Sequence, residues 1–265
     1  ISQRAVDWID GVAVGGAPFL LSLHYTAPHW PWETRDDAQL SEIVGSKLFH
    51  LDGGNIHSYR RMIHHMDEGI GRVMAALERH GVADDTLVIF TSDNGGERFS
   101  DNWPLVGGKM DLTEGGIRVP WIARWPRAIG PGRISAQHCM TMDWTATVLD
   151  AAGVPGAPDH PLDGVSLLAH LRGGPTFERP MHWRMNHRGQ RASRHGSWKY
   201  LQVDGHEYLF DIEADERERA NPAALEPGRL AAMREDWQRW NESMPPIPGD
   251  ATVSLGYSVK DMPQR

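Results

Sequence analysis

Residues 86–96 read Thr-Leu-Val-Ile-Phe-Thr-Ser-Asp-Asn-Gly-Gly, a short apolar run that ends in an acid, an amide and two glycines. This pattern predicts a buried strand over 86–91 that opens into a tight loop. In open α/β sheets, ligands bind at the carboxyl ends of the strands. Asp93 and Asn94 present hard oxygen atoms, which suit Ca²⁺ or Mg²⁺. Because Asn-Gly is also a strong turn dipeptide, a plain turn is the alternative interpretation.

The segments before this strand complete a supersecondary unit. Over 56–77, apolar residues recur at alternating spacings of three and four, which is one face of an amphipathic helix. The apolar run 18–25 predicts another buried strand. Strand, helix and strand in this order indicate a βαβ unit with parallel strands. The expected fold class is therefore α/β.

The last third of the chain changes character. Residues 153–180 are rich in Gly and Pro and suggest a boundary. Beyond it, short segments near 181–185, 198–203 and 208–210 predict a small antiparallel sheet, and a helix over about 225–240 is expected to pack on it. We therefore expect two domains: 1–175, the main α/β domain, and 176–265, a small C-terminal α+β subdomain with a tail.

Composition excludes some function classes. The chain has 265 residues, 40% of them hydrophobic and 23% charged, and a formal net charge of −8, so it lacks the basic footprint of a nucleic-acid-binding protein. No apolar run approaches the ~18 residues that cross a bilayer. We expect neither nucleic acid nor membrane as a partner. Cys139 is the single cysteine, so no disulfide can form within the chain.

Two further side chains extend the candidate site. His29 follows the run 18–25, so it should lie at the same sheet edge as Asp93 if the strands are parallel. Lys109 follows a pair of glycines that let the backbone approach an anion closely. A metal, a lysine and a histidine at one edge would form an oxyanion site that offsets charge growing during group transfer. Taken singly, each has a plainer interpretation as a structural or solvent-exposed loop residue.

Five segments carry a resemblance to a known family: Tyr-Thr-Ala-Pro-His at 25–29, Thr-Ser-Asp-Asn-Gly-Gly at 91–96, Gly108-Lys109 leading to Glu-Gly-Gly-Ile-Arg-Val-Pro at 114–120, Leu-Asp-Gly-Val-Ser-Leu at 162–167 and Tyr-Leu-Phe-Asp at 208–211. In this order they resemble the sulfatases of the alkaline phosphatase superfamily, in particular the arylsulfatase A and N-acetylgalactosamine-6-sulfatase type. The resemblance implies an alkaline-phosphatase-like, mostly parallel sheet flanked by helices. It also implies hydrolysis of aryl or carbohydrate sulfate esters.

The resemblance also assigns roles to residues. Asp93 and Asn94 match two ligands of the divalent cation, Ca²⁺ or Mg²⁺. His29 and Lys109 match the pair that binds the sulfate and assists the departing alcohol. In the family, a hydrated formylglycine attacks sulfur while the metal and the cationic side chains offset charge on the sulfate oxygens. The implied partner is a sulfated small molecule or sugar, and bacterial members are commonly periplasmic or secreted.

Several features of the family are absent. Its formylglycine is made from Cys or Ser in a Cys/Ser-x-Pro-x-Arg motif, but Cys139 precedes Met-Thr-Met, and the nearest serine match, at Ser243, lacks the arginine. The family also has an acidic pair after its first strand, but Asp36-Asp37 lies in a polar loop, and Asp84-Asp85 precedes a strand, which is the wrong end for this sheet edge. These features belong to the N-terminal half of the family. We therefore expect this chain to be the C-terminal portion of a sulfatase, inactive without the missing N-terminal half and its formylglycine.

Two alternatives remain open at this point. The parent protein could hydrolyse phosphate or phosphonate esters, because the superfamily shares its metal cradle. A degenerate homologue retained as a binding or structural module is the non-catalytic alternative.

Overall fold

The structure is a computed structural model that describes residues 1–39, 42, 54–249 and 251. The chain divides into two compact units, each treated by itself below. The first holds residues 1–88 and 124–127, and the second holds residues 89–123 and the described residues from 128 onward.

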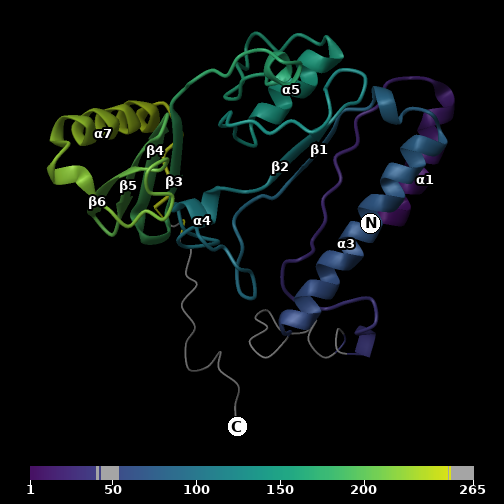
Figure 1. Ribbon diagram of the computed structural model, residues 1–265, viewed down its shortest axis with the longest axis horizontal. Coiled ribbons are helices and arrows are strands. Elements are labelled where there is room, and N and C mark those ends of the chain that lie inside the picture. Colours follow the sequence, from purple (N-terminus) through teal and green to yellow (C-terminus); the bar gives the residue numbers. More distant parts are fainter. Residues whose placement is uncertain (40–41, 43–53, 250, 252–265) are drawn as a thin grey trace. The chain divides into compact units, whose positions relative to one another are not determined.

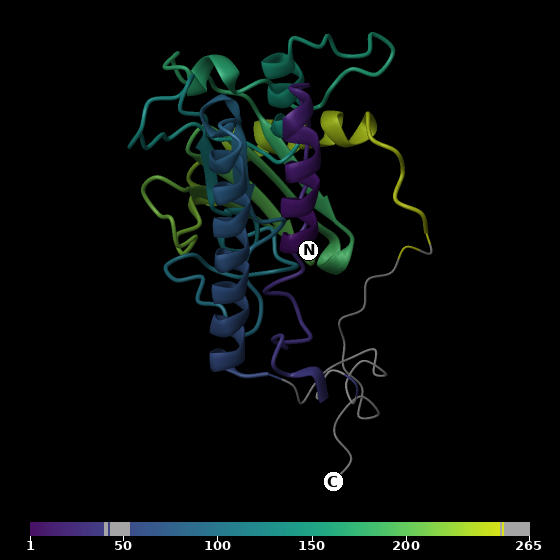
Figure 2. The ribbon, with the colours of Figure 1, turned by 90° about the vertical axis from the view of Figure 1, so that its right-hand side faces the viewer.

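Two helices form the core of the first unit. α1 (Ser2–Val12) lies alongside α3 (Ile56–Arg79), as Figures 1 and 2 both show. Their apolar faces meet in a cluster of buried residues: Val6, Ile9, Ala76, Leu77 and Ala83. The Asn55 side chain caps α3 by accepting hydrogen bonds from the backbone N–H groups of His57 and Ser58 at 2.9 and 3.0 Å. The helix predicted over 56–77 is confirmed.

The strand predicted over 18–25 is wrong, because this segment has no regular secondary structure. The chain runs past the helices, and Phe19 and Leu21 pack against the core of the first unit while Leu20 is 70% exposed. Exposure therefore alternates along this apolar segment, and Phe19 and Leu21 lie on the side that faces the helices. A strand also requires backbone partners, and apolar residues alone do not supply them.

The second unit begins with two short strands and three helices. β1 (Val88–Thr91) and β2 (Trp121–Arg124), which lie in this unit except for Val88 and Arg124, pair in a two-stranded sheet. α4 (Glu114–Ile117), α5 (Asp143–Ala152) and α6 (Leu168–Leu171) follow along the chain. The strand expected over 86–91 is present in shortened form. Short 3-10 turns occur at Ala13–Gly15, Ala83–Asp85, His187–Gly189 and Pro222–Ala224.

A four-stranded antiparallel sheet forms the rest of the second unit. Its strands are β3 (Met181–Met185), β4 (Gln190–His195), β5 (Trp198–Val203) and β6 (His206–Asp211), in spatial order β3-β4-β5-β6. α7 (Pro227–Glu242) covers one face, as Figure 1 shows. Tyr200 and Leu209 point from the sheet to Met233 and Trp237 of that helix. The predicted small antiparallel sheet with a packed helix is confirmed.

The opposite face of this sheet has its own apolar cluster. Ala192, Leu201 and Phe210 pack there with Leu112 and Ile212. Since side chains alternate between the two faces of a strand, Tyr200 and Leu201 belong to different layers. The division predicted at residues 175 and 176 stays a prediction, and its tail beyond residue 251 lies outside the described residues. None of the helices in the described chain has the length and apolar character needed to cross a membrane.

Candidate anion- and metal-binding site

Three glycine pairs bring three loop segments of the second unit together. The backbone N–H of Gly95 donates to the Gly116 carbonyl at 2.8 Å. The Gly115 N–H donates to the Val106 carbonyl at 2.8 Å, and the Lys109 N–H donates to the Gly96 carbonyl at 3.0 Å. The loop after β1, the loop that carries Lys109 and the start of α4 are therefore joined directly through their backbones.

The glycines are required because these backbones approach closely. A Cβ atom at Gly95 would lie 1.8 Å from the Gly115 carbonyl oxygen, and one at Gly116 would lie 2.1 Å from that of Asp111. A Cβ at Gly108 would meet the Gly96 oxygen at 2.5 Å. Backbone atoms cannot swing aside as a long side chain can. The sequence signal of paired glycines thus has a packing cause.

Asn102 braces the same loops. Its Oδ1 accepts from the Gly96 N–H at 3.2 Å, and its Nδ2 donates to the carbonyls of Gly96 at 3.1 Å and Gly107 at 3.0 Å. Sequence reasoning missed this residue, because a single asparagine in a polar loop gives no distinguishing signal. The neighbouring Trp103 is 69% exposed, and the Arg217 guanidinium lies 4.1 Å from its ring centroid.

The structure places three of the four predicted site residues on these joined loops. Asp93 and Asn94 form the bend that follows β1, where the Asn94 N–H donates to Asp93 Oδ1 at 3.0 Å. Lys109 Nζ lies 3.2 Å from Glu97 Oε2, and its side chain is 24% exposed. The Lys109 ammonium is thus tied to the loop that carries Asp93 both by backbone and by an ion pair. Glu97 is a further residue that the sequence did not reveal.

The fourth predicted residue, His29, belongs to the first unit. It is exposed, and its ring nitrogen Nδ1 donates to the Trp30 carbonyl at 2.7 Å. This hydrogen bond places the proton of the neutral ring on Nδ1. The convergence of His29 with the other three residues stays a prediction.

A buried charge network supports the loop at α4. Glu114, 1% exposed, forms ion pairs through Oε1 with Lys199 Nζ at 2.9 Å and through Oε2 with Arg194 Nη1 at 3.2 Å. Lys199 also pairs with Glu218 Oε1 at 2.8 Å. The second oxygen of Glu218 accepts from the Glu114 backbone N–H at 2.7 Å. Arg194 and Lys199 of the antiparallel sheet therefore hold Glu114, the residue before Gly115, in place, and Glu218 completes the network.

This network explains opposite pKa shifts of its two acids. Arg194 and Lys199 face each other on β4 and β5, an unfavourable pairing of like charges without acids between them. Burial would raise the pKa of Glu114, but Lys199 and then Arg194 outweigh it and hold that pKa below its ordinary value. Burial raises the pKa of Glu218. Lys199 and the hydrogen bond from the Glu114 backbone N–H oppose this shift, and the charge of the Glu114 carboxylate adds to it.

The donor atoms at the β1 corner fit part of a divalent cation site. Asp93 offers a carboxylate and Asn94 an amide oxygen, both hard ligands, whereas Ca²⁺ takes about 6–8 oxygens. The two acidic pairs considered from the sequence are engaged locally in the first unit: Asp37 accepts two hydrogen bonds from Thr34, both 2.8 Å, and Asp85 pairs with Arg127 at 3.0 Å. Asp93 and Asn94 can supply two ligands and require others.

Asp93, Asn94 and Lys109 thus lie on loops that are joined through their backbones. Their oxygen atoms are of the type that suits a divalent cation, and the ammonium group is of the type that suits an anion. The sulfatase family model matches residues 1–154, and the chain belongs to the sulfatase family. The sulfatase resemblance and the mixed α/β fold class predicted from the sequence are thereby confirmed.

Individual relatives agree with this assignment. The chain is 32% identical over 185 residues to N-acetylgalactosamine-6-sulfatase of Canis lupus familiaris, which covers 68% of this chain and 33% of that protein. It is 42% identical over 132 residues to steryl-sulfatase of Mus musculus, covering 46% of this chain and 21% of that protein. The chain thus spans about a third or less of the length of these curated relatives.

Solved structures extend the likeness over most of the chain. The crystal structure of Ps i-CgsB matches with a TM-score of 0.78 and 27% identity, covering 90% of this chain and 53% of that one. The same protein in complex with k-i-k-neocarrahexaose matches with a TM-score of 0.77 and 28% identity, again over 90% of this chain and 53% of that one. This chain therefore has part of the sulfatase fold.

Proposed function

We propose that this chain is part of an enzyme that hydrolyses sulfate esters, with a sulfated carbohydrate as the substrate class. The observation that carries the proposal is the set of glycine-packed loops that present Asp93, Asn94 and Lys109. The substrate class is supported by relatives whose names refer to N-acetylgalactosamine 6-sulfate and by the neighbouring structure in complex with a neocarrahexaose.

Each residue has a role in this proposal. Asp93 and Asn94 hold a Ca²⁺ or Mg²⁺ ion, which when bound supplies positive charge beside the sulfate oxygens. The Lys109 ammonium offsets negative charge on the same oxygens. His29 assists the departing alcohol as a general acid, which requires the doubly protonated ring, because the Nδ1 proton is engaged by the Trp30 carbonyl.

The nucleophile and the remaining metal ligands come from outside this sequence in our proposal. The chain has no Cys/Ser-x-Pro-x-Arg motif in which a formylglycine could form. We therefore expect the chain alone to give no turnover of an aryl sulfate such as 4-nitrophenyl sulfate. Release of 4-nitrophenol above the buffer rate by the purified chain would contradict this part of the proposal. For the complete protein we propose export or a periplasmic location, as is common among bacterial members of the family.

Anion binding by the chain tests the site itself. Calorimetric titration with inorganic sulfate in the presence of Ca²⁺ should show weak binding, and Lys109→Ala should weaken it about tenfold or more, because hydrogen bonds to charged groups contribute about 1.5–3 kcal/mol. Arg72→Ala, an exposed position of α3, is the matched control and should bind sulfate as the wild type does. Equal sulfate affinity of Lys109→Ala and the wild type would refute the assignment.

The same titration separates the alternatives. Clear preference for phosphate over sulfate would favour a phosphate or phosphonate ester hydrolase of the same superfamily. Absence of any anion binding, with and without Ca²⁺, would favour a degenerate, non-catalytic homologue.

A further inference from the structure

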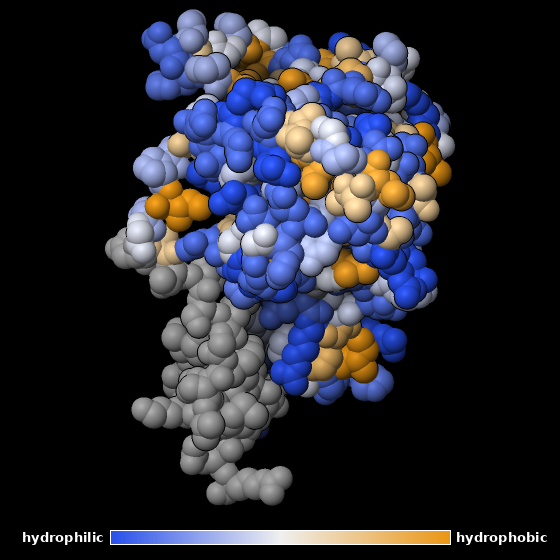
Figure 3. Space-filling view, turned by 90° about the vertical axis from the view of Figure 1, so that its left-hand side faces the viewer, coloured by the Kyte–Doolittle hydropathy of each residue, from blue (hydrophilic) through white to orange (hydrophobic). Residues whose placement is uncertain are grey.

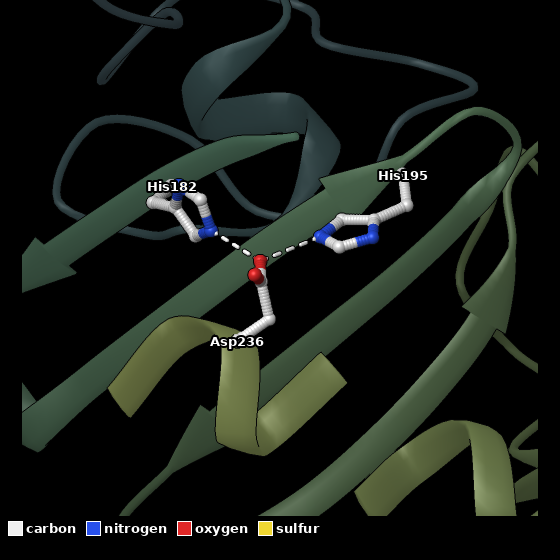
Figure 4. Close-up of side chains that lie close together, drawn as sticks. All are labelled: His182, His195 and Asp236. Carbon is white, nitrogen blue, oxygen red and sulfur yellow. Dashed lines mark hydrogen bonds and ion pairs between the residues drawn. The ribbon is translucent and has the colours of Figure 1, made fainter. Parts of the chain in front are cut away.

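A second group of metal-ligating side chains lies on the antiparallel sheet, away from the glycine-packed loops. It consists of His182 on β3, His195 at the end of β4 and Asp236 on α7, which point toward one another in Figure 4. Asp236 Oδ2 lies 2.7 Å from His182 Nε2 and 2.9 Å from His195 Nε2. All three candidate ligand atoms lie within 4.8 Å of one another.

The strand register places both histidines on the same face. His182 lies opposite Ser193, and His195 is two residues further along β4, so all three side chains point to the side covered by α7. The Ser193 hydroxyl accordingly donates to the Met233 carbonyl of α7 at 3.5 Å. Asp236 lies three residues after Met233, on the helix stripe that packs against the sheet.

The surroundings fix the orientation of each ligand. The His182 ring stacks on Trp240, with centroids 5.1 Å apart and an interplanar angle of 12°. Arg239 Nη2 donates to the other carboxylate oxygen of Asp236, Oδ1, at 3.1 Å, which leaves Oδ2 facing both imidazoles. Hydrogen bonds of this kind orient the carboxylate ligands of metal sites.

The group is shielded and has a path to solvent. The His182 side chain is 10% exposed, whereas that of His195 is 37% exposed. A cleft of about 400 Å³ opens beside His195 and is lined also by Trp198, Glu226 and Arg229. Figure 3 views the molecule from the side on which α7 lies in Figure 1, and that surface is mostly hydrophilic with small separate hydrophobic groups.

We propose that His182, His195 and Asp236 form a binding site for a divalent transition metal ion of the Zn²⁺ type. Two imidazoles and one carboxylate suit such ions, whereas the oxygen-only corner at Asp93 suits Ca²⁺ or Mg²⁺. Three protein ligands leave a fourth position open for water or a ligand. On binding, the ion replaces the hydrogen bonds that now join the rings to the carboxylate.

Cobalt titration of the full chain tests the site with a spectroscopic readout. Co²⁺ should give visible absorption bands that saturate at a single ion per chain, and Zn²⁺ should abolish them by competition. Asp236→Asn keeps the shape of the side chain and removes its charge, so we expect Co²⁺ affinity to fall about 10–100-fold or more. His195→Gln, at a half-exposed strand end, should weaken binding similarly.

Two control variants make the result specific. His206→Gln, an exposed histidine of β6, should leave Co²⁺ binding unchanged. Asp93→Asn should also leave it unchanged, because that residue belongs to the proposed Ca²⁺ or Mg²⁺ site. Zn²⁺ should raise the melting temperature of the wild type and of both controls, but not that of Asp236→Asn. No saturable Co²⁺ bands in the wild type, or equal affinity in folded Asp236→Asn, would overturn the proposal.

Discussion

Lys199 is a fully buried cation on the sheet face that carries Leu201 and Phe210, and its environment shows how single residues support the site. Its ammonium lies between Glu114 and Glu218, and Arg194 completes the network. Removing one partner from such a group leaves an uncompensated charge in the interior, which is far more destabilising than losing an exposed ion pair.

We therefore expect Lys199→Met to lower the free energy of unfolding of the second unit by about 3–5 kcal/mol. Urea unfolding followed by circular dichroism measures the change. Arg188→Ala breaks the exposed pair with Asp204 in the same sheet region and should leave the urea midpoint nearly unchanged. A Lys199→Met midpoint equal to that of the wild type would show that the network does not hold the fold.

The opposite pKa shifts of Glu114 and Glu218 predict opposite pH dependences. Because the pKa of Glu114 is lowered in the folded state, its contribution is present above the ordinary value of 4.5 and is lost as the pH falls through the lowered value. Glu114→Gln should therefore reduce the loss of stability in acid. The pKa of Glu218 is raised, so the wild type loses stability as the pH rises from 4.5 through the raised value.

Glu218→Gln should consequently gain stability relative to the wild type as the pH rises above 4.5. Urea midpoints of the wild type and both variants, measured at several pH values, provide the comparison. If the two variants change the pH slope in the same direction, the assignment of the two carboxyl groups is wrong.

At the scale of elements, the three glycine pairs determine how close the site loops lie. The Cβ of an alanine at position 95 would meet the backbone oxygen of Gly115, whereas one at position 130 has no atom within 4 Å. These two glycines therefore provide a matched pair: the same substitution, in a packed loop and in an open one.

We expect Gly95→Ala to destabilise the second unit by about 1–3 kcal/mol, because the backbone at Gly115 and Gly116 must move away. Sulfate binding should weaken as well, since the Gly115 N–H is hydrogen-bonded to Val106 of the loop that carries Lys109. Gly130→Ala should stay within about 1 kcal/mol of the wild type. Thermal unfolding and sulfate titration measure the two effects. Normal sulfate affinity in Gly95→Ala would mean that the loops can separate without harm to the site.

Elements differ in how well the sequence predicts them. The helix α3 follows from its own spacing of apolar residues, since an amphipathic helix makes its backbone hydrogen bonds internally. The run 18–25 has the composition of a strand, yet pairing depends on another segment, and the structure places Phe19 and Leu21 against helices. The apolar composition therefore predicted a strand buried on both faces, whereas only one side of the segment packs and its backbone is irregular.

At the scale of the whole molecule, each compact unit has its own core. The first is built on α1 and α3, where Asp10 forms ion pairs with His80 at 2.7 Å and Arg79 at 2.6 Å. The second is built on the antiparallel sheet, with apolar clusters on both faces. Separate cores favour separate unfolding transitions.

Calorimetry of the full chain should accordingly resolve two transitions. Asp10→Ala should lower the temperature of one transition, and Lys199→Met should lower that of the other. A single transition that both variants shift equally would show that the units unfold as one.

The sequence by itself predicted the family, through five motif segments in the expected order, and the α/β class. It also predicted the long helix from its apolar spacing and put three candidate site residues on loops whose glycines allow close backbone contact. Only the tertiary structure decided the partners of Lys199 and the meeting of His182, His195 and Asp236. Glu114 contacts Lys199 of β5, and His182 of β3 contacts Asp236 of α7. Strand register and the packing of α7 on the sheet bring these distant residues together. No local pattern encodes such contacts, since they depend on which faces of distant elements are buried against each other.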